Sequence, residues 1–172
     1  MMAGGVEEIG APEHLTPTYD ISTFDCGVPE LNDWLKRRAL PNEESGASRT
    51  YVVCSAGRVV GYYALASGGV AIAKAAGRVR RNMPDPLPVM ILGRLAVKRG
   101  WQGRNIGRSL LRDAVLRTLQ AAEIGGIRAI LVHVISEDAK RFYERYGFSV
   151  SPVDSMTLMV TVADAKKALF EK

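Results

Sequence analysis

The segment Gln102-Gly103-Arg104-Asn105-Ile106-Gly107-Arg108 stands between an apolar strand predicted over residues 89–97 and a helix predicted over 106–123. A strand that leads through a glycine-rich turn into a helix is typical of sites that bind phosphate groups. The unpaired N–H groups of the first helical turn point outward there, and the helix dipole adds partial positive charge. Arg104 and Arg108 add formal charge beside them. The segment therefore predicts a diphosphate site at the start of this helix.

Apolar periodicity predicts elements before this segment. An amphipathic helix over 28–43 follows a strand end and turn at 21–27, and Pro41 should kink or end that helix. Two strands then follow, over 50–54 and 59–65, joined by a hairpin turn. Residues 67–88 form a long basic excursion that contains several prolines, with helix predicted in part of it, over 71–79.

The elements after the segment alternate between strand and helix. A strand is expected over 127–135, a short helix over 137–146, a last strand over 157–162 and a terminal helix over 163–171. The fold class is therefore α/β (α+β). At 172 residues the chain is expected to form one domain over 13–172, preceded by a glycine-rich, polar and disordered N-terminus over 1–12.

Composition excludes several classes of protein. The chain is 47% hydrophobic and 24% charged, as in ordinary soluble domains. No apolar run approaches the roughly 20 residues that span a bilayer, and the N-terminus lacks the features of a signal peptide. Two cysteines are too few for a disulfide framework and favour a reduced, cytoplasmic setting. His14 and His133 lie far apart with no carboxylate or cysteine pattern near them, so no metal site is expected.

Positive charge is concentrated in one part of the chain. Residues 78–117 contain ten basic and two acidic residues, while the whole chain has a net charge of +5. A diphosphate cofactor needs two or three cations, so the remaining arginines either are solvated or bind a second polyanion. A one-sided basic field of this kind favours a nucleic acid.

Two motifs resemble the GCN5-related N-acetyltransferase (GNAT) superfamily. Leu95-Ala96-Val97 followed by Gln102 to Gly107 is similar to the acetyl-CoA pyrophosphate motif of that superfamily, with Asn105 where glycine is usual. The segment from Ala139 to Phe148 is similar to its Ala-x-x-Phe-Tyr-x-x-x-Gly-Phe signature. The resemblance implies a single GNAT domain, with a mixed, mostly antiparallel central sheet that splays at the acetyl-CoA site. Asparagine tolerates positive φ better than other non-glycine residues, so the turn should be kept.

A narrower resemblance covers nearly the whole chain. Phe24-Asp25-Cys26-Gly27, Leu31-Asn32-Asp33-Trp34-Leu35, Gly61 to Leu65 and Leu92 to Val97 resemble the acetyltransferase toxins of type II toxin–antitoxin pairs, the TacT and AtaT group. The resemblance implies acetylation of the α-amine of aminoacyl-tRNA, and hence a block of translation. It also implies a ribbon-helix-helix antitoxin encoded alongside, and it admits a homodimer.

The resemblance also assigns roles to residues. Tyr143 matches the catalytic tyrosine and would give a proton to the leaving thiolate; the alternative is a packing role. The cofactor residues would be those of the strand end and the turn: Leu95, Ala96, Val97, Gln102, Gly103, Arg104, Asn105, Ile106, Gly107 and Arg108. An α-amine has a pKa near 8 in simple peptides, and an aminoacyl ester should lower it further, so much of it is neutral at pH 7 and a strong base is dispensable.

Four arginines are candidates for contact with tRNA. Arg78, Arg80 and Arg81 lie in the basic excursion, where the alternative is a solvated loop. Arg94 lies within a strand, where an arginine is expected to face a cleft or to form a buried salt bridge. Two rival functions stay open: acetylation of a small amine or protein N-terminus, and a non-catalytic acyl-CoA-binding subunit.

Overall fold

The computed structural model describes residues 8–171, so most of the expected disordered segment, residues 1–7, lies outside the described residues. Within the rest of that segment, the backbone N–H of Gly10 donates to Cys54 O at 3.2 Å. No helix in the described part of the chain is both long and apolar enough to cross a membrane.

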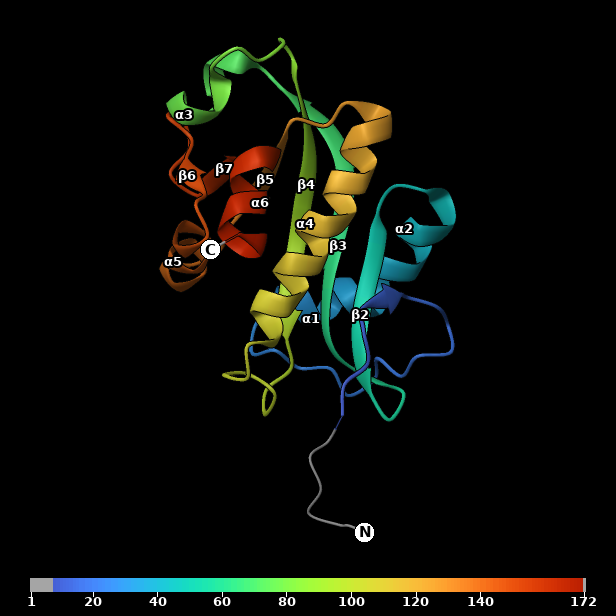
Figure 1. Cartoon of the computed structure of the whole chain (residues 1–172). Helices are drawn as coiled ribbons and strands as arrows, with labels where there is room; N and C mark the ends of the chain where they lie inside the picture. Colours follow the sequence, from blue (N-terminus) through green and yellow to red (C-terminus); the bar gives the residue numbers. More distant parts are fainter. Residues whose placement is uncertain (1–7, 172) are drawn as a thin grey trace. The chain divides into compact units, whose positions relative to one another are not determined.

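The strands form one sheet in the order β1-β2-β3-β4-β5-β7-β6 (Figure 1). β4 and β5 are parallel, whereas the β1–β2, β5–β7 and β6–β7 pairs are antiparallel. This confirms the expected mixed, mostly antiparallel sheet. The strands are β1 (Glu13–His14), β2 (Arg49–Ser55), β3 (Arg58–Val70), β4 (Leu87–Val97), β5 (Ala129–His133), β6 (Ser149–Val150) and β7 (Thr157–Thr161).

Contacts divide the chain into two compact units. The first contains the residues up to Ala64 together with Arg94–Leu110, and the second contains Leu65–Gly93 together with the residues from Leu111 on. β3 and β4 contribute residues to both units. The proposed phosphate-binding turn belongs to the first unit and Tyr143 to the second.

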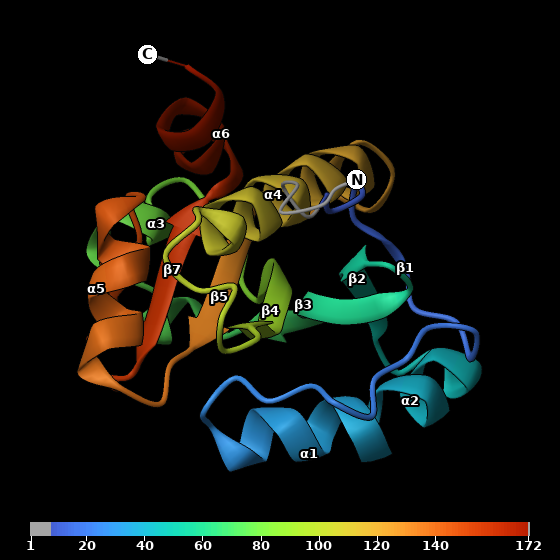
Figure 2. The same cartoon turned by 90° about the horizontal axis from the view of Figure 1, so that it is seen from below.

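In the first unit, α1 (Pro29–Arg37) and α2 (Ala39–Ser45) lie on the same side of β2 and β3 (Figure 2). Their buried core contains Phe24, Leu35, Ala39, Val52, Val59 and Tyr62. On β3, a Cβ atom added to Gly61 would lie 3.1 Å from Cδ1 of Leu110 and 3.0 Å from Cγ2 of Val53. Glycine at this position therefore lets the start of the helix after β4 pack closely against β3.

The expected single helix over 28–43 is wrong: it is two helices, broken at Arg38. Arg38 has φ −113° and serves as the C-cap of α1 and the N-cap of α2. Pro41 lies in the first turn of α2, where an intrahelical N–H bond is not needed. In a continuous helix, Pro41 would leave Arg37 O without its partner and clash with it, so the break comes before the proline.

The second unit is built on β4, β5, β7 and β6. Its helices are α3 (Gly77–Arg80), α5 (Glu137–Arg145), α6 (Val162–Phe170) and most of α4 (Ile106–Gly125), and a short 3-10 helix, η1, covers Ile72–Lys74. The helix expected within 71–79 is thus two short turns. One core cluster joins α3 to the sheet through Val79, Val89, Leu131 and Met159.

The parallel pairing of β4 with β5 is short. Register partners run from Val89 with Ala129 to Leu92 with Val132, whereas β4 itself continues to Val97. β4 therefore extends beyond its pairing with β5.

Candidate active site

The turn between β4 and α4 has three residues with positive φ. Gly100 has φ +86°, Gly103 has φ +78° and Asn105 has φ +63°. Asn105 thus adopts the left-handed conformation that its side chain tolerates, as expected. The turn retains its shape without a glycine at this position.

The N-terminus of α4 presents free backbone donors. The backbone N–H of Ser109 bonds to Asn105 O at 3.1 Å, so Asn105 precedes the helix and Ile106 begins it. The N–H groups of Ile106, Gly107 and Arg108 come before this first bond and have no partner within the helix. Ile106 is buried, which anchors the helix end, while Arg108 is exposed. Such an end suits a diphosphate.

Arg104 does not extend freely from this turn. Its Cζ lies 4.8 Å from the centroid of the Trp101 ring, an arrangement that a cation–π attraction of about 0.5–1 kcal/mol favours at an exposed site. The guanidinium therefore stays close to the turn, where its N–H groups can donate to a ligand.

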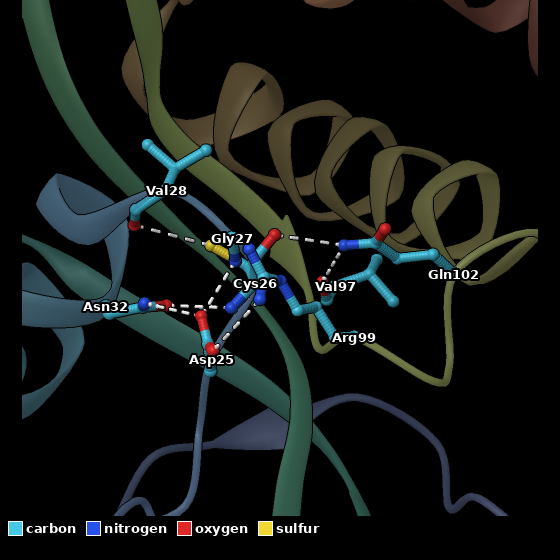
Figure 3. Close-up of polar contacts among 8 residues, drawn as sticks. All are labelled: Asp25, Cys26, Gly27, Val28, Asn32, Val97, Arg99 and Gln102. Atoms are coloured by element: carbon cyan, nitrogen blue, oxygen red, sulfur yellow. Dashed lines mark hydrogen bonds and ion pairs between the residues drawn. The ribbon is translucent and has the colours of Figure 1, made fainter.

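Gln102 joins the turn to two other backbone segments. Its Nε2 donates to Val97 O at 2.8 Å and to Cys26 O at 3.0 Å (Figure 3). The side-chain amide thus uses its two protons on protein carbonyls. It fixes the start of the turn against the end of β4 and against the Phe24–Gly27 segment.

The Phe24–Gly27 segment is itself held by a network around Asp25 (Figure 3). Oδ1 of Asp25 accepts from Gly27 N and from Asn32 Nδ2, both at 2.9 Å. Oδ1 of Asn32 accepts from Cys26 N at 2.8 Å. Arg99 donates its backbone N–H to Asp25 O at 2.8 Å and places its guanidinium 3.8 Å from Oδ2.

The surroundings of Asp25 and Cys26 in this network shift the pKa values of both side chains. The hydrogen bonds from Gly27 and Asn32, with the charge of Arg99, hold the pKa of Asp25 below its usual value. Burial raises the pKa of the Cys26 thiol, which donates to Val28 O at 3.6 Å. Cys26 is therefore a packing residue rather than a nucleophile.

The end of β4 carries the other expected cofactor residues and Arg94. Ala96 is buried, and Leu95 and Val97 are half-buried. Arg94 is half-buried, with its Cζ 4.7 Å from the centroid of Trp34, and Trp34 stacks on Tyr62 at 6.0 Å. Arg94 thus packs over an aromatic ring, and no salt bridge joins it to a carboxylate of the described residues.

Tyr143 lies on α5 in the second unit. Ser136 caps this helix by accepting from Ala139 N at 3.1 Å. The Tyr143 ring is 7% exposed and makes edge contacts with Phe142 at 5.1 Å and Phe148 at 5.2 Å. Burial raises the pKa of Tyr143, so the phenol stays protonated at physiological pH and keeps a proton that it can donate.

The three arginines of the excursion differ from one another. Nε of Arg78 pairs with Oδ2 of Asp164 at 2.9 Å, so its charge is partly neutralised. Arg80 and Arg81 are exposed at the end of α3.

The structure thus groups the expected residues by unit. Arg94 and the ten cofactor candidates lie in the first unit, and Tyr143 lies with the other three arginines in the second. Asp25 and Asn32 were not among the expected site residues, since only the fold links them to Gln102. Both nevertheless lie in motifs that resemble the toxin group. Among the described residues, no group of three or more His, Cys, Asp or Glu side chains is placed to hold a metal ion.

Known proteins resemble this chain along most of its length. Residues 46–150 match the family described as the acetyltransferase (GNAT) domain. A tRNA-acetylating toxin of Mycobacterium tuberculosis is 53% identical over 156 residues, 91% of this chain and 94% of the relative.

Two solved structures share the fold. AtaT complexed with acetyl-methionyl-tRNAfMet has a TM-score of 0.84 and 26% identity, over 92% of this chain and 98% of that chain. A variant of AtaT bound to the C-terminus of the antitoxin AtaR and acetyl-CoA has a TM-score of 0.79 and 26% identity, over 92% of this chain and 96% of that chain.

Proposed function

Since this chain belongs to the GNAT acetyltransferase family, and within it to the group of tRNA-acetylating toxins that includes TacT and AtaT, we propose that it acetylates the α-amine of aminoacyl-tRNA and so blocks translation. The observation that carries this proposal is the 53% identity to a tRNA-acetylating toxin over nearly the full chain. The concentration of arginines in 78–117 supports it, because a diphosphate alone does not need ten basic residues.

Acetyl-CoA is the acetyl donor in this proposal. The three positive-φ residues of the turn and the free N–H groups of α4 fit a diphosphate, with Arg104 and Arg108 beside it. The backbone of Leu95, Ala96 and Val97 would bind the pantetheine arm as a neighbouring strand does. Gln102 would act by shaping the turn, since both of its amide protons already bond to the protein.

The chemistry needs a neutral amine, a polarised carbonyl and an acid for the thiolate. The pKa of an α-amine is about 8 in simple peptides, and the aminoacyl ester lowers it further, so much of the amine is neutral near pH 7. Backbone N–H groups at the end of β4 would polarise the thioester carbonyl. The buried phenol of Tyr143 keeps its proton and would donate it to the departing sulfur.

The nucleic acid would meet the exposed arginines of α3. Arg80 and Arg81 carry full charges there, whereas Arg78 shares its charge with Asp164. Arg94 would contribute through the Arg94–Trp34 stack, which keeps its guanidinium in one place.

An antitoxin is the expected protein partner. The AtaT structure with the AtaR C-terminus supports a peptide-like mode of neutralisation. We expect a ribbon-helix-helix protein encoded beside this chain and a cytoplasmic setting shared with charged tRNA, and the resemblance admits a homodimer.

The proposal is tested by incubating the protein with charged tRNAs and radiolabelled acetyl-CoA. We expect label on the aminoacyl group of at least one isoacceptor, released with the amino acid by mild alkali. Absence of label from every isoacceptor would overturn the proposal. Uncharged tRNA is the matched control and should gain no label.

The role of Tyr143 is tested by Tyr143→Phe. We expect unchanged affinity for acetyl-CoA and a fall in kcat of about 10²–10³-fold, as for loss of a general acid. Expression of the variant should no longer inhibit growth. A variant as active and as toxic as the wild type would assign Tyr143 a packing role only.

A further inference from the structure

A chain of hydrogen bonds links His133 to Asp154 through Thr157. Nδ1 of His133 lies 2.8 Å from Oγ1 of Thr157, and that oxygen lies 2.8 Å from Oδ2 of Asp154. His133 and Thr157 are register partners in the antiparallel pairing of β5 with β7. No carboxylate pattern marks His133 in the sequence, but the pairing of β5 with β7 connects His133 to Asp154 through Thr157.

This chain fixes which ring nitrogen of His133 carries the proton. Asp154 accepts from Met156 N at 2.9 Å and from Thr157, and these bonds lower its pKa, so the carboxylate is ionised and only accepts. Thr157 gives its single hydroxyl proton to Asp154, so its oxygen must accept from Nδ1 of His133. The neutral imidazole therefore holds its proton on Nδ1 and a lone pair on Nε2.

His133 stands just beyond the paired part of β4 and β5. The last register pair is Leu92 with Val132, and His133 is the next residue. Its side chain is exposed, although the other four residues of β5 are buried. Val134–Ser136 then lead into α5, which carries Tyr143. No hydrogen bond to Nε2 of His133 comes from the residues that the structure describes, so this nitrogen is available to a ligand.

The charged surroundings of His133 are simple. From β7 and the turn before it, the ionisable group that faces His133 is Asp154. The adjacent residues Leu92 and Gly93 of β4 and Leu158 of β7 are uncharged, and α5 begins with the exposed carboxylates Glu137 and Asp138. Arg141 on the same helix pairs with Asp138, so Asp154 is the carboxylate joined to His133, through Thr157.

We propose that His133, held by Thr157 and Asp154, accepts the amine proton during acetyl transfer. The amine nitrogen attacks the thioester carbonyl carbon, a C–N bond forms and the C–S bond breaks. The nitrogen becomes positively charged and gives a proton to Nε2 of His133, while the sulfur takes the proton of Tyr143. One proton thus moves from nitrogen to sulfur, and exchange with solvent restores both side chains. The base acts after attack, so the neutral amine of the ground state needs no strong base.

This inference rests on the proposed function for its natural substrate, so its kinetic test uses two acceptors, charged tRNA and glycinamide. His133→Gln should lower kcat with either acceptor by about 10²-fold, the lower end of the range for acid–base catalysis. KM for acetyl-CoA should not change. Thr157→Val keeps a strand-forming shape and should lower kcat by about 10-fold, since it removes only the group that orients the ring.

The second histidine supplies the matched control. His14→Gln changes an exposed imidazole on β1 that stacks on Tyr51, and it should leave kcat unchanged. If His133→Gln equals the wild type with both acceptors, the proposal is overturned. If the wild type acetylates glycinamide but no charged tRNA, the proposed function fails and the role of His133 is still measured.

A measurement without turnover tests the hydrogen-bond chain itself. Nitrogen-15 NMR of the neutral imidazole should show the proton of His133 on Nδ1 in the wild type and a shift toward Nε2 in Thr157→Val. A proton on Nε2 in the wild type would overturn the proposal, because that nitrogen would then have no lone pair.

Discussion

Asn105 takes a backbone conformation that residues other than glycine seldom adopt. Its φ of +63° follows Gly103 at +78°, and together they turn the chain into α4. The asparagine side chain makes this conformation tolerable, whereas a β-branched side chain would not. The affinity for acetyl-CoA should therefore depend on the residue at this position even though its role is conformational.

Asn105→Val should weaken acetyl-CoA binding by about tenfold, since the left-handed conformation costs a residue with a branched Cβ roughly 1–2 kcal/mol. Asn105→Gly should bind as the wild type does. Isothermal titration with acetyl-CoA measures both. Asn82→Val is the matched control, because Asn82 has φ +58° in another loop and its replacement should leave this affinity unchanged. Equal affinities for Asn105→Val and the wild type would contradict the assigned role of the turn.

At the scale of elements, the Phe24–Gly27 segment and the turn before α4 form one connected structure. Gln102 joins them, and Asp25 with Asn32 fixes the segment to the first turns of α1. A displacement of α1 is therefore transmitted to the turn through a short series of hydrogen bonds.

Gln102→Glu should disrupt this connection, because a carboxylate cannot donate to Cys26 O and Val97 O. Two lost hydrogen bonds of about 1 kcal/mol each should lower the melting temperature by several degrees and the affinity for acetyl-CoA by about tenfold. Gln120→Glu, the same change on an exposed part of α4, should alter neither quantity. Unchanged calorimetry and titration for Gln102→Glu would show that the turn is held by other contacts.

Local sequence signals predicted most of the helices and strands. They failed where residues far apart in the sequence determine the role of a side chain. The turn and α4 follow from glycines, asparagine and apolar spacing, all of which are local. The break at Arg38 was expected too late, because the proline acts on the residue four positions before it. The role of Gln102 depends on Cys26, and that of His133 on Thr157, and neither pair is visible until the strands are assembled.

At the scale of the whole molecule, net positive charge is concentrated in residues 78–117. Three arginines of this stretch interact with other side chains: Arg78 pairs with Asp164, Arg94 covers Trp34, and Arg112 lies 4.4 Å from the centroid of Phe170. The sequence predicted the excess of charge, but only the structure distinguishes these three arginines from Arg80 and Arg81, which are exposed at the end of α3.

The Arg80→Ala/Arg81→Ala variant should bind charged tRNA more weakly and with a weaker dependence on salt. Each lost phosphate contact reduces the slope of log K against log salt concentration by about 0.7–0.9, so the slope should fall by about 1.5. Affinity for acetyl-CoA should stay the same. Lys166→Ala/Lys167→Ala removes an equal charge from α6 and should leave the slope unchanged. An identical slope for Arg80→Ala/Arg81→Ala and the wild type would place the nucleic acid elsewhere.

Both tryptophans of the chain lie under a guanidinium group. A cation over an indole changes the electric field at the ring, so each arginine should influence the emission of the tryptophan beneath it. Arg94 over Trp34 belongs to a half-buried stack with Tyr62. Arg104 over Trp101 lies in the turn proposed for the diphosphate, where a bound anion would compete with the ring for the same cation. Addition of acetyl-CoA should therefore change the emission of Trp101 without any attached dye.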